Sequence, residues 1–264
     1  RIIKLTCKNS TFIHSEAVRD SDNVNSAIEV YFQIGRRNHE TDSRLSLLAS
    51  ILNEPCFDYL RTKEQLAYIV FSGKVVDDGI LGLRIIVQSA KCAPKELDEH
   101  IEAFLTSFRK KLANISEEEF CKQRDSLIIS CLKKPKSMID ETFRYVSEIK
   151  SKTYTFDRKW KLASELDQLS LNDVVSFFDH FVAKGAAKRR KLSIRIVGKS
   201  NDVKESQINE ATDFTNHEDT VHASQIEVSM SYGASENGEI VINDLDQFKR
   251  SMCLYPVEAS DCKK

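Results

Sequence analysis

A long block of helical pattern between two groups of strand-like segments is the feature that most constrains this fold. Apolar residues recur at helical spacing over residues 94–181. β-branched and aromatic residues concentrate before this block, in segments 27–34, 68–71 and 81–88, and after it, in segment 192–198. Strands at both ends of a helical block are typical of an α+β fold. We therefore predict an α+β module with helices packed on one face of the sheet.

Turn and cap signals refine this prediction. The turn Asp77-Asp78-Gly79 separates two of the strands, which predicts a hairpin and hence a sheet rich in antiparallel pairs. Upstream, a helical pattern begins near Glu40. Glu54-Pro55 then predicts a second helix that runs to about residue 66, because proline is tolerated in the first turn of a helix. Further helices are expected to begin at Pro94, after Ser116, near Ile139 and after Ser170.

Three segments are expected along the chain. Residues 1–23 alternate poorly and are predicted to be a linker or an N-terminal arm, and residues 24–200 form the α+β module. Residues 201–264 begin as a polar loop and end as an extension that packs back on the module. Because the chain starts with Arg1, we expect it to be an excised or processed piece of a longer protein. In the last segment, short strands are expected at 226–230 and 240–242, and a short helix at 244–250.

Composition excludes several classes of protein. The chain has 39 Lys and Arg against 40 Asp and Glu, and this balance argues against a nucleic-acid-binding protein. No apolar run approaches the roughly 20 residues that a membrane span needs. The seven cysteines are odd in number and contain no C-x-x-C pair, which favours free thiols in a reducing compartment. We therefore expect a cytoplasmic location, with no nucleic-acid or membrane partner.

No complete zinc motif occurs in these residues. His217-Glu218 begins the motif H-E-x-x-H, but Val221 stands where the second histidine belongs, and His222 is one position too far. The inverted motif H-x-x-E-H is also absent, because Glu99-His100 has Glu96 at the position of the first histidine. We therefore expect no metal ligand and no cofactor in this chain itself.

A polar segment at the predicted helix-to-strand junction contains candidate site residues. Arg61 and Tyr68 are seven residues apart, so that both lie on one side if the helix continues, and both can face one cleft if it ends earlier. A guanidinium and a phenol are donors suited to a peptide carbonyl or to a developing oxyanion. From the local pattern alone, an Arg–Glu surface pair and a half-buried sheet-edge tyrosine are the more frequent arrangement.

The same segment resembles a known enzyme family. Residues 54–73 read EPCFDYLRTKEQLAYIVFSG, which strongly resembles the C-terminal half of the insulysin branch of the inverzincin (M16) metallopeptidases. The likeness extends over about residues 24–256. Its supporting matches are Gly79-Ile80, Gly82-Leu83-Arg84, Lys134-Pro135-Lys136, the run from Tyr154 to Arg158, and Phe248-Lys249-Arg250.

The resemblance implies a role for three residues. Members of this family are built from four α+β modules that form two halves around a chamber, and the zinc motif lies in the N-terminal half. The C-terminal half is silent alone and contributes an arginine and a tyrosine. By position, Arg61 would bind the substrate backbone and Tyr68 would donate to the oxyanion. Phe57 would line the subsite near the scissile bond. The chain would then be the fourth module with its preceding linker.

The function that this resemblance implies is the C-terminal substrate-chamber module of a zinc metalloendopeptidase that degrades small peptides. Its partners would be peptide substrates and the N-terminal half of the same polypeptide, which would hold the Zn²⁺, and a homodimer is left open. The fragment alone is expected to be inactive. Ala67 stands where a glycine is common, which would cost energy if that backbone has a positive φ. The alternative is a non-catalytic peptide-binding or scaffolding module of an inactive homologue.

Overall fold

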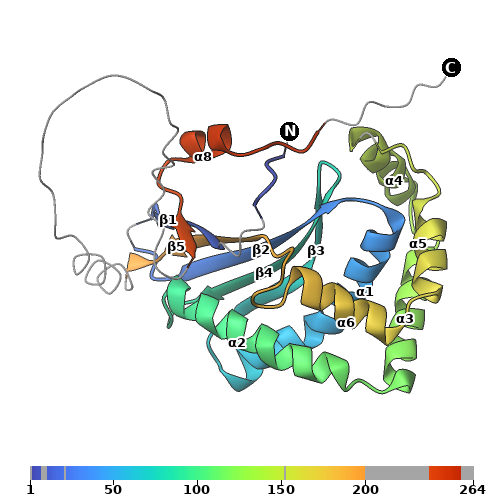
Figure 1. Cartoon of the computed structure of the whole chain (residues 1–264), viewed down its shortest axis with the longest axis horizontal. Coiled ribbons are helices and arrows are strands. Elements are labelled where there is room, and N and C mark those ends of the chain that lie inside the picture. The colour runs from blue at the N-terminus through green and yellow to red at the C-terminus, as the bar shows by residue number, and fades with distance from the viewer. Residues whose placement is uncertain (1, 7–10, 21, 152, 200–237, 257–264) are drawn as a thin grey trace, which may run out of the picture.

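The computed structural model describes residues 2–6, 11–20, 22–151, 153–199 and 238–256 (Figure 1). A single six-stranded sheet crosses it in the order β3-β4-β2-β5-β1-β6. Three of the five strand pairs are antiparallel, and β1 pairs in parallel with both β5 and β6. The strands are β1 (Thr11–Ala17), β2 (Ser26–Arg36), β3 (Ile69–Asp77), β4 (Ile80–Ser89), β5 (Lys191–Val197) and β6 (Glu239–Val241).

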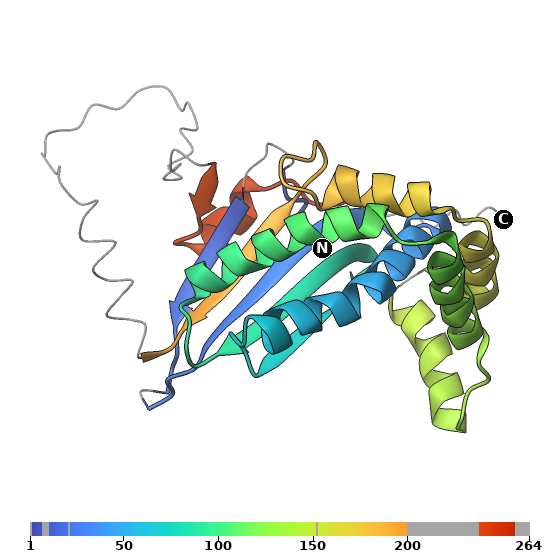
Figure 2. The same ribbon diagram turned by 90° about the horizontal axis from the view of Figure 1, so that it is seen from below.

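Helices α1, α2 and α6 lie on one face of the sheet, α3, α4 and α5 are grouped beside α1 at one end, and α8 lies on the other side of the sheet (Figures 1 and 2). This confirms the predicted α+β class with an antiparallel-rich sheet. In the described part of the chain, no helix is both long and apolar enough to cross a membrane. The helices are α1 (His39–Phe57), the π-helical segment η1 (Asp58–Lys63), α2 (Pro94–Ala113), α3 (Glu117–Leu132), α4 (Met138–Lys150), α5 (Arg158–Asp167), α6 (Leu171–Phe181) and α8 (Leu245–Ser251).

The main hydrophobic core lies between the sheet and the helices. Alternate residues of β2 and β4 point into it, as expected for strands with one buried face. The apolar stripes of α1 and α2 cover these residues, so that the predicted helical spacing corresponds to a real buried face. Its most central members include Val30, Phe32, Leu48, Leu83, Ile101 and Phe108.

An ionic cluster also attaches α2 to the sheet. Asp98 of α2 accepts a hydrogen bond of 2.6 Å from Lys191 and one of 2.8 Å from Arg195, both on β5. Burial alone would raise the pKa of Asp98, but the two cations outweigh burial and lower it. The carboxylate therefore stays ionised and pairs with both cations inside the protein.

One strand was not anticipated. Residues 11–17, which the sequence predicts to lie in an arm or linker, form β1 between β5 and β6. Only Phe12 and Ile13 are buried in this strand, and the residues after them are polar or exposed. The alternation of apolar and polar residues is therefore too short to indicate a strand from the sequence. β1 exists because a strand more than 170 residues away pairs with it in parallel.

The prediction of a second helix starting at Glu54-Pro55 is wrong. Helix α1 continues through Pro55 and ends at Phe57. Proline lacks the N–H group that a helix interior uses, so one backbone hydrogen bond is missing there. Burial explains the continuity, because Leu52 and Cys56 are fully buried on either side of Pro55 and hold the helix against the core.

The described end of the chain packs back on the sheet. β6 lies along β1, and the ring of Phe248 in α8 lies 5.5 Å from the ring of Phe12. The side chain of Asp244 caps α8 by accepting hydrogen bonds from the N–H groups of Asp246 and Gln247. The strand predicted at 226–230 lies outside the described residues.

Candidate functional site

The predicted site residues lie where α1 passes into β3. η1 follows α1 directly, and its buried residue Leu60 fixes this segment to the core. The guanidinium of Arg61 lies over the ring of Phe57, 5.0 Å from its centre. Both side chains are exposed. Stacking on the ring limits the orientations of the guanidinium and leaves its donors available at the surface.

The backbone after η1 is wound more widely than an α-helix. The N–H of Glu64 bonds to the carbonyl of Tyr59 at 3.0 Å, and the N–H of Leu66 bonds to that of Leu60 at 3.2 Å. π-helical turns of this kind are frequent at functional sites. Gln65 has a φ of 51°, so the left-handed residue is Gln65 and not Ala67. The expected cost of alanine at position 67 therefore does not arise.

Tyr68 lies immediately before β3. Its N–H donates to the carbonyl of Gln88 on β4 at 3.2 Å, which aligns it with the start of the hairpin. The hydroxyl of Ser89 donates to the carbonyl of Leu66 and further fixes this approach. The Tyr68 side chain is 46% exposed, so that its phenol can reach a ligand. The helix-to-strand junction expected near residues 60–70 is therefore present.

The structure brings two of the three predicted residues into contact. Phe57 and Arg61 touch, whereas no hydrogen bond or ring contact joins Tyr68 to either of them within the described residues. None of the three is sealed in the interior. A substrate that used all three would have to extend along the junction from the end of α1 to the start of β3.

Two apolar residues beside Tyr68 were missed by the sequence analysis. Ile69 and Phe71 of β3 are both exposed, although they belong to a strongly apolar strand run. Arg84 of β4 lies over the Phe71 ring, 5.2 Å from its centre. Their period-2 spacing places them together on one sheet face, but the sequence does not indicate that this part of the face is uncovered. An exposed apolar stretch of sheet therefore follows Tyr68 directly in the chain.

Comparison with known proteins identifies the region. A family model described as PQQ synthase PqqF-like, C-terminal lobe domain 4, matches residues 47–146. Insulin-degrading enzyme of Drosophila melanogaster is 37% identical over 193 residues, which are 73% of this chain and 19% of that protein. The Homo sapiens enzyme is 34% identical over 233 residues, which are 88% of this chain and 22% of that protein.

The chain is homologous to the C-terminal region of insulin-degrading enzyme. It spans about a fifth of the length of these relatives. Among solved structures, pitrilysin superposes with a TM-score of 0.69 at 19% identity, over 96% of this chain and 23% of the pitrilysin chain. At that identity the superposition shows a shared fold, and it confirms the M16-type module that the sequence predicts.

The described part of this insulin-degrading-enzyme-like region does not fit a zinc ion. Its residues contain no group of three or more His, Cys, Asp or Glu side chains that could hold a metal. His217 and His222 lie outside the described residues. Cys56 is buried, and burial raises the pKa of its thiol to about 12, so it stays protonated near neutral pH.

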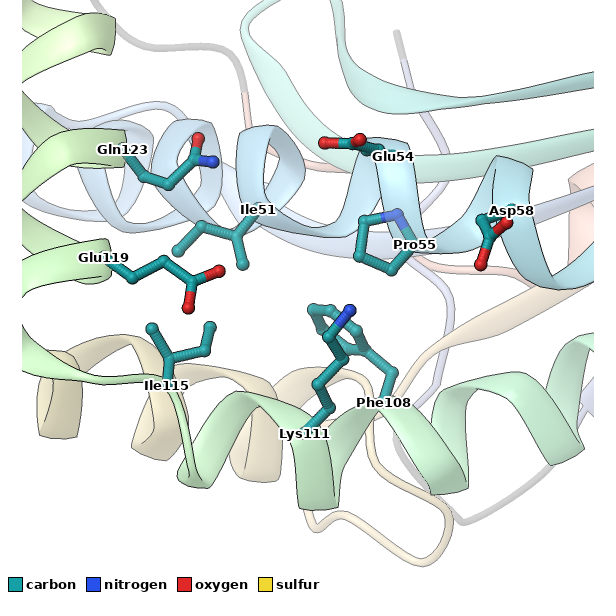
Figure 3. A pocket seen from close by; sticks show the side chains of 9 residues that line it. All are labelled: Ile51, Glu54, Pro55, Asp58, Phe108, Lys111, Ile115, Glu119 and Gln123. Carbon is teal, nitrogen blue, oxygen red and sulfur yellow. The ribbon is translucent and has the colours of Figure 1, made fainter.

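A separate pocket of about 280 Å³ opens on the helix side, between α1, α2 and α3 (Figure 3). Three carboxylates and one ammonium group line it, together with apolar side chains. None of Phe57, Arg61 and Tyr68 belongs to it, so this pocket is distinct from the candidate site. Its lining residues are Ile51, Glu54, Pro55, Asp58, Phe108, Lys111, Ile115, Glu119 and Gln123.

Proposed function

We propose that this chain is the C-terminal substrate-chamber module of a zinc metalloendopeptidase that degrades small peptides in the cytoplasm. The metal would belong to the N-terminal half of the same parent polypeptide, since the described residues offer no ligand cluster. The observation that supports this proposal is an exposed Arg61 within the π-helical segment η1 and an exposed Tyr68 between η1 and β3, in a region homologous to insulin-degrading enzyme.

Each group has a defined task in this proposal. The Arg61 guanidinium, oriented by Phe57, presents several N–H donors and binds carbonyl oxygens of the peptide backbone. The Tyr68 phenol donates a hydrogen bond to the carbonyl oxygen under attack, where negative charge develops. Both donors are attached to rigid elements, α1–η1 and the β3–β4 hairpin, so little reorganisation is needed when the substrate arrives.

The apolar residues after Tyr68 extend this contact. Ile69 and Phe71 offer an exposed apolar surface to side chains of a bound peptide. Backbone hydrogen bonds along a strand distinguish little between peptide sequences. The alternate side chains of the bound peptide would therefore determine which peptides bind best. We expect peptides with large apolar residues on one side of the cleavage position to bind best.

Removal of the Tyr68 hydroxyl in the parent enzyme tests the proposal. Tyr68→Phe is expected to lower kcat about 10²-fold with a smaller change in KM, which is the usual scale for one oxyanion donor. Tyr154→Phe is a matched control, because Tyr154 is also an exposed tyrosine but lies outside the junction. Equal turnover in the Tyr68→Phe variant and the wild-type parent would reject the role of the phenol.

A non-catalytic scaffolding or peptide-binding module is the alternative. The N-terminal part of the parent distinguishes the two, because an intact His-x-x-Glu-His there is required for the enzyme. If that motif is broken, peptide binding without hydrolysis is expected, and Arg61→Ala should still weaken binding since its carbonyl contacts do not depend on chemistry.

A further inference from the structure

Helix α4 presents its apolar side to solvent. Ile139, Phe143 and Val146 follow the helical spacing i, i+4, i+7 and form one stripe, with Met138 beside it. Met138 is 84% exposed, Ile139 65% and Phe143 66%. In a monomeric soluble domain such a stripe normally faces the core, and a large contiguous apolar surface marks an interaction site.

The opposite side of α4 is polar and is attached to the module. Glu148 lies two and a half turns after Ile139, so the two side chains point in opposite directions. Its carboxylate accepts two hydrogen bonds from the Arg158 guanidinium, one from the Thr153 hydroxyl and one from the Thr155 N–H. These bonds determine which side of α4 faces inward, so the outward apolar stripe is a consequence of specific contacts.

Neighbouring aromatic residues enlarge the surface. The rings of Tyr145 and Phe156 lie 5.9 Å apart, and Arg144 lies over both Tyr145 and Trp160. All three aromatic residues are exposed. They come from α4, from the segment before α5 and from α5 itself, so the surface spans more than one helix. Aromatic residues and arginine are the types most enriched in the centres of protein interfaces.

A shallow groove runs beside the stripe. It has a volume of about 360 Å³, and Asp78 in the β3–β4 turn faces Phe143, Val146 and Lys150 of α4 across it. Figure 1 shows α4 at the end of the molecule opposite to β1. The surface is therefore both apolar and shaped to receive a protruding segment.

We propose that this surface, formed by the outward side of α4 and the aromatic residues around Trp160, is where the preceding part of the parent polypeptide docks. The inference rests on the proposed function, because it requires this chain to be a module of a longer enzyme. The matching relatives have about four-fifths of their length outside this region. The description of the matching family model, C-terminal lobe domain 4, also implies that other domains belong to the same protein.

A covalently connected partner explains the composition of the surface. A module in the same polypeptide is present at a high effective concentration, so it covers this surface permanently. Permanent interfaces are more hydrophobic than transient ones and resemble a protein core cut in half. Met138, Ile139 and Phe143 have that character, whereas a transient peptide site would be expected to carry more polar groups.

Oxidation of Met138 tests this docking without any mutation. The native and denatured parent are treated with a limiting dose of hydrogen peroxide, and sulfoxide at Met138 is quantified by peptide mass spectrometry. Met138 is expected to be oxidised roughly tenfold more slowly in the native parent, because oxidation follows exposure. In the isolated 264-residue chain it should react nearly as fast as in the denatured parent.

Three other results of the oxidation experiment would contradict docking of the preceding part of the polypeptide. Fast oxidation of Met138 in the native parent would overturn the proposal, because the surface is then open. Protection in the isolated chain that grows with protein concentration would overturn it in favour of a second copy. Protection in the isolated chain at every concentration would also overturn it, since α4 would then be covered by its own module.

A charge-insertion variant provides the second test. A protease site is placed before Arg1 in the parent, and the retention of the released module on the remainder is measured. Ile139→Glu combined with Phe143→Glu should weaken retention by about tenfold or more, the scale for central interface residues. Leu245→Glu is the matched control, because Leu245 is an exposed apolar residue in the first turn of α8, where an acid is tolerated.

The two proposals can fail separately. Unchanged retention in the double variant, with full activity of the parent, would reject the docking surface and leave the peptidase function intact. A parent that never cleaves peptides but protects Met138 would reject the enzyme and keep the docking surface.

Discussion

Helices α2 and α4 have the same kind of sequence pattern and opposite orientations. Both show apolar residues at helical spacing with charged residues between them. In α2 the stripe is buried, and Phe108 is only 2% exposed, whereas in α4 Phe143 is 66% exposed. Each helix also has one buried carboxylate, Asp98 in α2 and Glu148 in α4. In α2 the buried stripe and this carboxylate both hold the helix against the module. In α4 the stripe is exposed, and the carboxylate provides the main attachment of the helix to the module.

The difference shows that periodicity reveals an apolar side without revealing what covers it. For α2 the cover is the sheet of the same module. For α4 the apolar stripe is exposed within the described residues, and a polar cluster fixes the helix in place. The two helices should therefore respond differently to the same substitution.

The largest contrast is expected from matched phenylalanine truncations. Phe108→Ala removes a ring packed 5.6 Å from Phe104 and 5.8 Å from Phe178, and it should lower the free energy of unfolding by about 3–5 kcal/mol. Phe143→Ala in the same isolated chain should change it by less than about 0.5 kcal/mol, because an exposed ring loses little packing. Urea titrations followed by circular dichroism measure both values.

In the parent polypeptide this contrast should shrink. Phe143→Ala should become destabilising there if the α4 surface is covered, while the cost of Phe108→Ala should stay the same. A large loss from Phe143→Ala already in the isolated chain would mean that α4 packs inward and that the two helices are alike.

A smaller effect is expected from the attachment of α4. Glu148→Gln removes the charge that Arg158 pairs with and should destabilise the local structure of α4 by about 2 kcal/mol, the scale of hydrogen bonds to charged groups. Hydrogen exchange of the α4 amides measures this. Glu141→Gln is the matched control, because Glu141 is exposed and its ion pair with Arg144 is 3.9 Å long, so its removal should change little. Unchanged exchange in Glu148→Gln would mean that other contacts hold the helix.

Acid should release α4 for the same reason. Burial alone would raise the pKa of Glu148, but the hydrogen bonds from Arg158 and Thr153 outweigh burial and lower it to about 2. A carboxyl group with a lowered pKa in the folded state stabilises that state above its unfolded pKa, and this stabilisation is lost as the pH falls through the folded value. For Glu148 the loss occurs between about 4.5 and about 2.

Trp160 is a built-in probe for this transition. It is the only tryptophan of the chain and lies beside Arg144 of α4. Its emission should change between pH 4.5 and 2 in the wild-type chain, and this component should be missing in Glu148→Gln. A Trp160 transition that is identical in both would assign the acid response to another carboxylate, such as Asp98 of α2.

Local signals explain which parts of the fold could be predicted. The β3–β4 hairpin follows from Asp77-Asp78-Gly79, and α6 follows from Ser170 and Asp173, which form a capping box in the structure. β1 could not be predicted, because its pairing with β5 is a long-range property. The continuity of α1 through Pro55 was also missed, since burial of the neighbouring residues outweighed a local helix-breaking signal. α5 was not predicted either, although Asp157 is a favourable type of N-cap residue; in the structure Asp157 makes no capping hydrogen bond.

The candidate site also has residues that could be predicted from the sequence and residues that could not. Phe57, Arg61 and Tyr68 were selected by resemblance, and their exposure is compatible with a site, but their roles stay predictions. The neighbouring surface of Ile69 and Phe71 could not be selected, because an apolar strand residue looks the same whether its face is covered or open. The outward stripe of α4 was read as an ordinary helix for the same reason.

The smallest contrast concerns the helix caps. Ser137 begins α4 and Ser170 begins α6, and both form a capping box with an aspartate three residues later. Removing either hydroxyl, in Ser137→Ala or Ser170→Ala, should cost the helix about 1 kcal/mol. α6 has Val174, Phe177 and Phe178 buried in the core, so its loss should appear in global unfolding by urea.

For α4 the same loss should stay local. α4 contributes no large apolar residue to the core, so Ser137→Ala should speed hydrogen exchange in α4 and leave the urea midpoint unchanged. A shift of the midpoint equal to that of Ser170→Ala would show that α4 unfolds together with the core. The two helices would then differ in exposure but not in how strongly they are coupled to the rest of the module.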